Sequence, residues 1–147
     1  MAKTLIVGSD HAGVELKKEL ADVARELGYE INDVGTHSTE STDYPDYAHQ
    51  VASAVSRGEG LGLLVCGTGL GMSMSANRHP GVRAAVCGDV HSAAMARRHN
   101  DANVLCIGSR IVGTGLAGEI LKVFLSSSFE GGRHERRVHK IDPPDES

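Results

Sequence analysis

Short apolar segments alternate with amphipathic segments along the whole chain, and this alternation constrains the fold more than any other feature of the sequence. Five runs rich in Val, Ile, Leu and Ala are too short for helices and are closed by turn residues, at 4–7, 29–34, 61–66, 82–87 and 103–107. Helical periodicity occupies 14–27, 47–57, 71–78, 90–99 and 116–124. Strictly alternating strands and helices predict a parallel sheet with right-handed crossovers and helices on both faces.

The sequence therefore predicts an α/β three-layer sandwich with a five-stranded parallel sheet. We expect the flavodoxin-like (Rossmann-like) strand order 2-1-3-4-5, in which the direction of winding reverses between the first and third strands. Ligands bind at such a reversal, beyond the carboxyl ends of the strands. The loops expected there are 8–11 and 66–71, and both have unusual compositions.

Length and composition indicate one domain, residues 1–147, with a C-terminal arm and tail from about residue 128. The formal net charge of −4 argues against non-specific binding to nucleic acid or to an anionic membrane. Cys66, Cys87 and Cys106 show neither paired nor zinc-type spacing, and no apolar run approaches the length of a membrane span. We therefore expect a cytoplasmic protein with reduced thiols, no nucleic-acid partner and no membrane partner.

The glycine-rich loop after the third predicted strand is the strongest local signal in the chain. It runs Gly67, Thr68, Gly69, Leu70, Gly71 and opens a helix, so backbone N–H groups would converge there on an anion or a developing oxyanion. An ordinary tight turn is the alternative, although three alternate glycines exceed what one turn needs. No Lys-Ser or Lys-Thr follows, which excludes a Walker loop, and Met72 stands where a dinucleotide-binding fingerprint would have glycine.

Cys66 lies where the strand meets this loop, at a helix N-terminus that favours a thiolate, and it could act as a nucleophile or as a base. A low-molecular-weight phosphatase would need arginine at the position of Met72. A buried, inert cysteine is the alternative, and it is our default interpretation of Cys87 and Cys106.

Two pairs of polar residues could take part in the chemistry. Asp10 and His11 follow the first strand and could bind hydroxyl groups and assist proton movement, although Asp10 is also suited to cap a helix. His99 and Asn100 end a predicted helix, where a cationic His could be purely structural. The other histidines show no metal-ligand spacing, so we predict no metal.

Three arginines are candidates for binding phosphate, because guanidinium matches phosphate geometry in a bidentate manner. They are Arg110, Arg133 and Arg137. Arg133 and Arg137 share a face if the C-terminal arm is helical; a solvated basic face is the alternative.

Several motifs together resemble the type B ribose-5-phosphate isomerases, over nearly the whole chain and in the right order. These are 8–13, 43–45, 66–71, 76–77, 99–105, 108–110 and 130–134. The family also contains allose- and galactose-6-phosphate isomerases. The resemblance implies a flavodoxin-like homodimer or tetramer that needs no cofactor and interconverts ribose 5-phosphate and ribulose 5-phosphate in the pentose phosphate pathway.

The resemblance also implies residue roles. Cys66 would be the base that moves the proton between C1 and C2, with Thr68 beside it. The amides of Gly67, Gly69, Leu70 and Gly71 would stabilise the enediolate, and His99 would open the furanose ring. Asp10, His11 and Asn100 would bind sugar hydroxyls, and Arg110, Arg133 and Arg137 would hold the phosphate. Part of the family uses a glutamate where Met72 stands, so this chain is expected to belong to the cysteine branch.

Predicted topology adds a condition on the site. His99 and Asn100 precede the fifth strand and so lie at the amino end of the sheet, opposite the Cys66 loop; a shared site would need a second copy of the chain. The sequence leaves open a preference for a pentose or a hexose phosphate. A non-catalytic module binding phosphate or nucleotide remains the competing class, because a fold alone does not fix a function.

Overall fold

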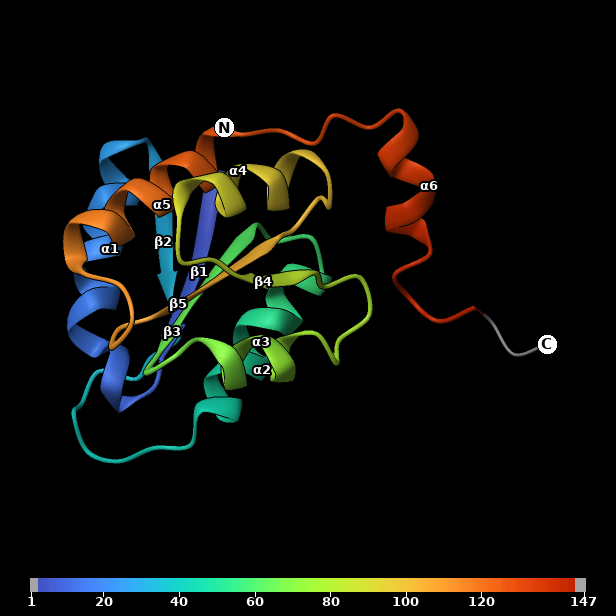
Figure 1. Ribbon diagram of the computed structural model, residues 1–147. Helices are drawn as coiled ribbons and strands as arrows, with labels where there is room; N and C mark the ends of the chain where they lie inside the picture. Colours follow the sequence, from blue (N-terminus) through green and yellow to red (C-terminus); the bar gives the residue numbers. More distant parts are fainter. Residues whose placement is uncertain (1–2, 145–147) are drawn as a thin grey trace.

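The structure is a computed structural model that describes residues 3–144. It is a three-layer α/β sandwich around one parallel sheet (Figure 1). The strands are β1 (Lys3–Ser9), β2 (Tyr29–Asp33), β3 (Leu61–Cys66), β4 (Ala84–Val86) and β5 (Val104–Gly108). The α-helices are α1 (Val14–Glu26), α2 (Tyr44–Ser56), α3 (Leu70–Ala76), α4 (Val90–Arg98), α5 (Thr114–Ser126) and α6 (Arg133–His139); a short 3-10 turn, His11–Gly13, precedes α1. The predicted fold class is confirmed.

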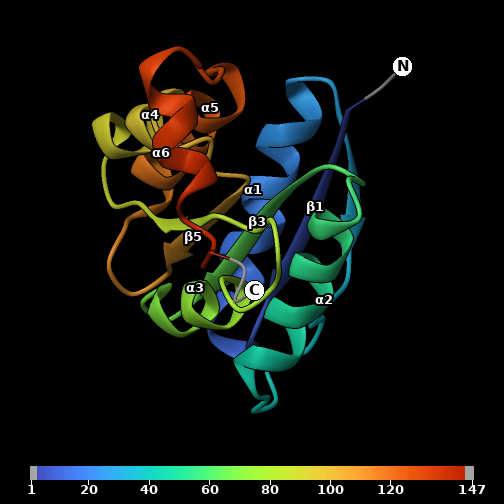
Figure 2. The same cartoon turned by 90° about the vertical axis from the view of Figure 1, so that its right-hand side faces the viewer.

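The sheet is buried on both faces, because successive side chains of a strand point to opposite sides. Leu63 and Val65 of β3 pack against α1, α4 and α5, whereas Leu64 and Cys66 pack against α2 and α3. Figure 2 shows these two helical layers on either side of the strands. Met72 of α3 is fully buried in the same core as Cys66, which explains how an apolar residue is accommodated at this position.

The predicted order of the last two strands is wrong. The sheet runs β2-β1-β3-β5-β4, so β5 lies between β3 and β4. Every residue of β5 is buried, as expected for an inner strand of a parallel sheet. β4 has three residues and none of them is fully buried, as expected for the edge strand of the sheet.

The strand register fixes where the candidate residues lie. Cys66, the last residue of β3, is paired with Gly108, the last residue of β5, so the loops that follow these strands are neighbours. Residues 99–103 precede β5 and lie at the amino end of the sheet, as predicted. About 16 Å of strand separates the two ends of β3.

The C-terminal arm forms α6, which lies at one side of the sandwich beyond the end of α4 (Figure 1). A glycine pair at 131–132, both residues with positive φ, precedes the helix and turns the chain into it. None of the helices described is long and apolar enough to cross a membrane.

Candidate active site

The Cys66 thiol lies at the carboxyl end of β3, under the glycine-rich loop. The backbone N–H of Gly69 donates a hydrogen bond to Sγ at 3.1 Å, and the Cys66 residue is 5% exposed. Gly69 has φ of 82°, a left-handed conformation that disfavours side chains, and it directs the chain into α3. The loop therefore offers a donor to negative charge on the sulfur.

The loop that follows β5 is hydrogen-bonded to the loop that follows Cys66. The Ser109 N–H donates to the Cys66 carbonyl at 2.8 Å, and the Arg110 N–H donates to the Gly67 carbonyl at 3.0 Å. The Arg110 side chain lies against Gly67, where an added β-carbon would be 3.1 Å from its guanidinium. Arg110 thus belongs to the same cluster as the thiol, at the carboxyl ends of the strands.

Asp10 and His11 follow β1 at the same end of the sheet. The Asp10 carboxylate accepts from the Ala12 N–H at 2.9 Å, which confirms its predicted capping role. The Asp10 N–H donates to the Val65 carbonyl at 3.3 Å and joins this turn to β3, next to Cys66. His11 Nδ1 accepts the Thr42 N–H at 3.2 Å, so a neutral His11 carries its proton on Nε2, which remains able to donate.

The structure therefore brings one group of predicted residues together, which we call the thiol half-site. It consists of Asp10, His11, Cys66, Gly67, Thr68, Gly69, Leu70, Gly71 and Arg110. All of these residues lie at or just beyond the carboxyl ends of β1, β3 or β5, which are adjacent strands.

The other two cysteines occupy different surroundings. Burial raises the pKa of Cys87 to about 11, with a smaller contribution from the charge of Asp89. Cys106 lies inside β5, and its pKa is raised further than that of Cys87. Burial is the main cause, and the neighbouring thiols Cys66 and Cys87 raise it as well. Their burial agrees with the interpretation of Cys87 and Cys106 as structural residues.

His99 lies in a second group at the other end of the sheet, where it follows the last turn of α4. Its ring stacks on the ring of His134, with centroids 4.2 Å apart and planes 14° from parallel. Glu130 Oε1 is 3.7 Å from His99 Nε2 and 3.8 Å from His134 Nε2. The Glu130 N–H donates to the Arg98 carbonyl at 3.0 Å, which ties the segment before α6 to the end of α4.

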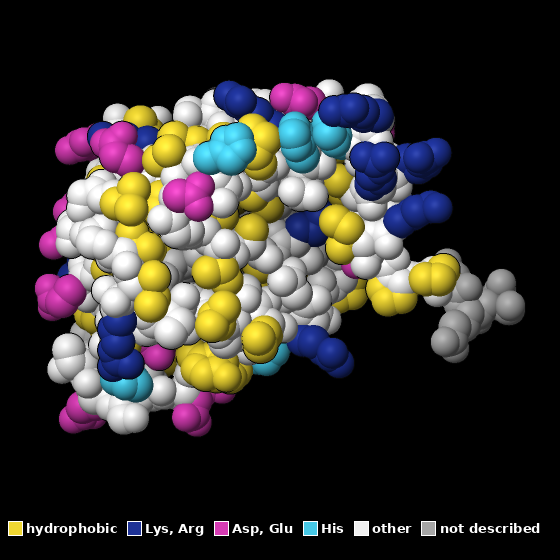
Figure 3. Space-filling view, in the orientation of Figure 1, with side chains coloured by type: hydrophobic (Ala, Val, Ile, Leu, Met, Phe, Trp, Pro, Cys, Tyr) yellow, Lys and Arg dark blue, Asp and Glu magenta, His cyan; other side chains and the backbone are white. Residues whose placement is uncertain are grey.

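Arg133 and Arg137 stand one turn apart on α6, so they share a helix face as predicted. Figure 3 shows Lys and Arg side chains gathered over the region of α6. We call His99, Asn100, Arg133 and Arg137 the histidine half-site. The structure does not bring this group to Cys66 within one chain, because residues 99–103 lie at the amino end of the sheet.

Glu130 and His134 were not given roles from the sequence, although both fall in the C-terminal motif. Their relation to His99 depends on the fold, but their own spacing of four residues is a signal that places them near each other. Ligand atoms of His99, Glu130 and His134 lie within 4.8 Å of one another, close enough by distance to hold a metal ion.

The surrounding charges disfavour a metal at this cluster. The pKa of His134 is lowered first by partial desolvation and then by the neighbouring His99 and Arg133; Glu130 acts in the opposite direction, and Arg137 lowers the pKa slightly. The Arg133 and Arg137 charges on the same helix, which oppose an imidazolium, also oppose a divalent cation. We therefore interpret the cluster as a stacked histidine pair beside the Glu130 carboxylate rather than as a metal site.

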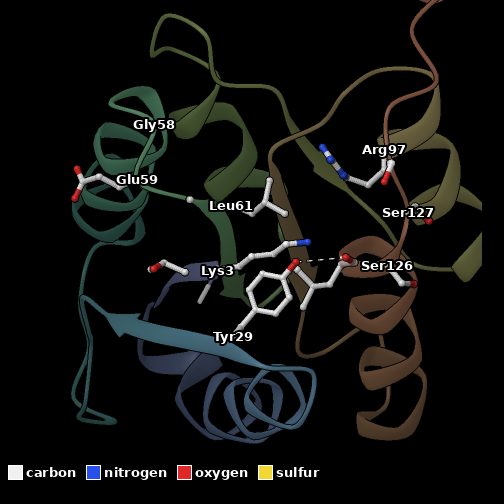
Figure 4. Close-up of a pocket in the computed structure, with 12 residues that line it drawn as sticks. Lys3, Tyr29, Gly58, Glu59, Leu61, Arg97, Ser126 and Ser127 are labelled. Carbon is white, nitrogen blue, oxygen red and sulfur yellow. Dashed lines mark hydrogen bonds between the residues drawn. The ribbon is translucent and has the colours of Figure 1, made fainter. Parts of the chain in front are cut away.

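A cavity of about 650 Å³ opens at the amino end of the sheet (Figure 4). It is lined by residues that include Lys3, Tyr29, Leu61 and Arg97. None of the residues predicted for the site lines it. Its size alone does not make it the candidate site, because the thiol and the glycine-rich loop lie at the opposite end of β3.

Comparisons with known proteins agree with the motifs. The profile of the ribose/galactose isomerase family matches residues 5–141. Ribose-5-phosphate isomerase B of Escherichia coli (strain K12) is 50% identical over 140 residues, which cover 95% of this chain and 94% of that protein. The structure of ribose-5-phosphate isomerase B from Clostridium thermocellum superposes with a TM-score of 0.92 at 52% identity, covering 94% of each chain.

A third relative was solved with a ligand. Ribose-5-phosphate isomerase B from Mycoplasma genitalium, with bound ribulose 5-phosphate, has a TM-score of 0.92 and 41% identity. The match covers 96% of this chain and 95% of that one.

Proposed function

Because the chain belongs to the ribose/galactose isomerase family, we propose that it interconverts ribose 5-phosphate and ribulose 5-phosphate through an enediolate. The observation that carries this proposal is the thiol half-site. A cysteine, a glycine-rich loop and an imidazole N–H donor meet there at the ends of three adjacent strands. An aldose–ketose isomerase needs a base, donors for a developing oxyanion and an anchor for the part of the substrate that does not react.

Cys66 acts as the base in this proposal. Its thiolate removes the proton from C2 of the open-chain aldose, and the electron pair of that C–H bond forms the enediolate with C1. The proton returns to C1, and the proton of the O2 hydroxyl passes to O1, so that O2 becomes the ketone oxygen and O1 the hydroxyl. Amides of the 67–71 loop stabilise the negative charge on oxygen, and the Gly69 N–H that contacts Sγ supports the thiolate.

Ribose 5-phosphate is mainly a closed ring in solution, so the ring must open first. His99 is proposed to transfer the protons, because an imidazole can both donate and accept a proton. Since His99 lies at the other end of the sheet from Cys66, the His99 that serves a given thiol comes from a second copy of the chain. Two copies related by a two-fold axis would form two equal sites, each from one thiol half-site and one histidine half-site.

Sugar hydroxyls are bound by Asp10, by the Nε2–H of His11 and by Asn100 of the second copy in this arrangement. Arg110 of one copy with Arg133 and Arg137 of the other hold the phosphate. Thr68 is two residues from Cys66 in the same loop, and its hydroxyl accepts the Leu70 N–H at 3.3 Å. The proposal requires no cofactor, and we place the reaction in the cytoplasmic pentose phosphate pathway.

The experiment is a coupled isomerase assay of the full-length protein with ribose 5-phosphate, allose 6-phosphate and galactose 6-phosphate. We expect the highest kcat/KM with ribose 5-phosphate. A higher value with either hexose phosphate would change the substrate and leave the mechanism in place. No turnover of any of the three by a folded oligomer would favour a binding module, which a search for co-purified nucleotide would then test.

A further inference from the structure

Lys17 is a charged residue on the buried face of α1. Positions 14, 17, 20, 21 and 24 line one side of the helix, and all five are buried. The other four are Val14, Leu20, Ala21 and Ala24, which are apolar, whereas the Lys17 side chain is 0% exposed. Burying an ammonium group costs free energy unless the group is paired, so a buried Lys17 indicates specific hydrogen-bond partners.

The Lys17 ammonium bonds to two groups at the end of β2. Nζ donates to Asp33 Oδ1 at 2.8 Å and to the carbonyl oxygen of Thr36 at 2.6 Å. The same Asp33 oxygen accepts the Gly35 N–H at 2.9 Å. Lys17 therefore fixes the turn by which the chain leaves β2.

This turn is also joined to the end of β1, just before Asp10 and His11. The Ser9 N–H donates to the Gly35 carbonyl and the Thr36 N–H donates to the Ser9 carbonyl, both at 2.8 Å. The turn held by Lys17 is thus hydrogen-bonded to the last residue of β1, directly before the Asp10 and His11 of the thiol half-site.

Two local hydrogen bonds follow in the loop after Thr36. Thr36 Oγ1 accepts the Ser38 N–H at 3.5 Å, and Ser38 Oγ accepts the Glu40 N–H at 3.1 Å. Two residues further, the Thr42 N–H donates to His11 Nδ1 at 3.2 Å. This last contact is the one that leaves the proton of a neutral His11 on Nε2.

We propose that Lys17 is a positioning residue for His11. Its ammonium holds the Asp33–Thr36 turn, the turn anchors the loop that follows, and the loop presents the Thr42 N–H that fixes the tautomer of His11. The role of His11 toward the sugar rests on the proposed isomerase function. The effect on the His11 ring does not, so the two can fail separately.

The test compares Lys17→Met, Lys17→Gln and Leu20→Ala in the full-length protein. Methionine has similar length and no donor, whereas glutamine keeps N–H donors without the charge. Leu20 is also fully buried on α1, one turn further along, and contributes no donor to the loop. Leu20→Ala therefore controls for loss of stability, measured for all three by urea unfolding.

The decisive readout is the ¹⁵N spectrum of His11 in histidine-labelled protein, assigned with His11→Gln. In the wild type, we expect neutral His11 to show a protonated Nε2 and an unprotonated Nδ1. In Lys17→Met, the chemical shifts of both ring nitrogens should move toward the values of a tautomer mixture. In Lys17→Gln these shifts should change less, and in Leu20→Ala they should stay at the wild-type values.

Isomerase kinetics form the second readout. A displaced site residue can cost up to about a hundredfold in rate, so kcat/KM for ribose 5-phosphate should fall about tenfold or more in Lys17→Met. Lys17→Gln should recover part of this loss.

An unchanged His11 spectrum in a folded Lys17→Met protein would overturn the proposal, whatever the activity. If that variant does not fold, an unchanged spectrum in Lys17→Gln with kinetics equal to those of Leu20→Ala would overturn it instead. If the wild-type protein has no isomerase activity while Lys17→Met still shifts the His11 resonances, the positioning role is supported and the proposed function is contradicted.

Discussion

Gly108 lies directly against the backbone of Thr68. A β-carbon at position 108 would be 2.7 Å from both the carbonyl carbon and the carbonyl oxygen of Thr68. Because both partners are main chain, neither can rotate away as a side chain would. The backbone at the end of β5 thus packs directly against the loop over Cys66.

We expect Gly108→Ala to displace the 67–71 loop and to lower kcat/KM by about tenfold to a hundredfold. Overpacking of this kind also costs about 1–3 kcal/mol of stability. Gly88→Ala is the matched control, since a β-carbon at 88 meets no atom within 4 Å. Enzyme kinetics and urea unfolding of both variants check the prediction; equal activity in the two would show that the contact does not set the loop.

Cys66→Ala should abolish isomerisation while the fold and phosphate binding stay nearly intact. The thiolate is needed for proton transfer, whereas the phosphate is held elsewhere in the proposed site. Exchange of the C2 proton with deuterated solvent, followed by NMR, is the direct measurement. Exchange at the wild-type rate in the variant would exclude Cys66 as the base.

Mixing two inactive variants should restore activity if the site is shared. Cys66→Ala and His99→Ala chains, unfolded and refolded together, are expected to regain up to about a quarter of wild-type activity. Half of the dimers would then be mixed, and each mixed dimer would hold one intact site of its two. Variants refolded separately should remain inactive, and verified mixed dimers without activity would rule out either the shared site or the role of His99.

Replacing Arg133 or Arg137 with alanine should weaken substrate binding by about tenfold or more, because each would lose a charge-assisted hydrogen bond to phosphate. An inhibitor that resembles the sugar but lacks the phosphate should lose much less affinity. Arg136→Ala, on the same helix, is the control. Inhibition constants measured with both kinds of compound provide the check, and equal losses for the two would contradict a phosphate clamp.

Alkaline solutions should destabilise the protein through Cys87. Its pKa is raised to about 11 in the folded state from an ordinary value of 9.0, so its contribution is complete below pH 9 and is lost as the pH rises toward 11. We expect the free energy of unfolding to fall less between pH 9 and 11 in Cys87→Ala than in the wild type. Urea titrations at both pH values measure this difference, and equal falls would count against the raised pKa.

The sequence was sufficient for the fold class and for placing the candidate residues at two opposite ends of the sheet. Strand ends are local features, so the sequence alone placed Cys66 at the carboxyl end of β3 and His99 at the opposite end of the sheet. The order of β4 and β5 was wrong because periodicity describes single strands and not their neighbours. The weaker apolar character of 84–86 beside the fully apolar 104–107 was the available signal for an edge strand.

Contacts between distant segments could not be predicted in the same way. The stack of His99 on His134 depends on how α6 returns to the end of α4, which no motif encodes. Lys17 was the exception that the sequence could have revealed. It interrupts an otherwise apolar helix face, and a charge at such a position indicates a buried partner.

The position of β5 between β3 and β4 also has a consequence for synthesis. While the chain emerges from the ribosome, β3 has an open edge until residues 104–108 arrive to pair with it. Open strand edges recruit other chains, so a nascent or prematurely terminated product that ends before residue 104 would be prone to aggregate. The loop over Cys66 likewise acquires its support only when Gly108 is in place, so the surroundings of this thiol are completed late, after most of the chain has been made.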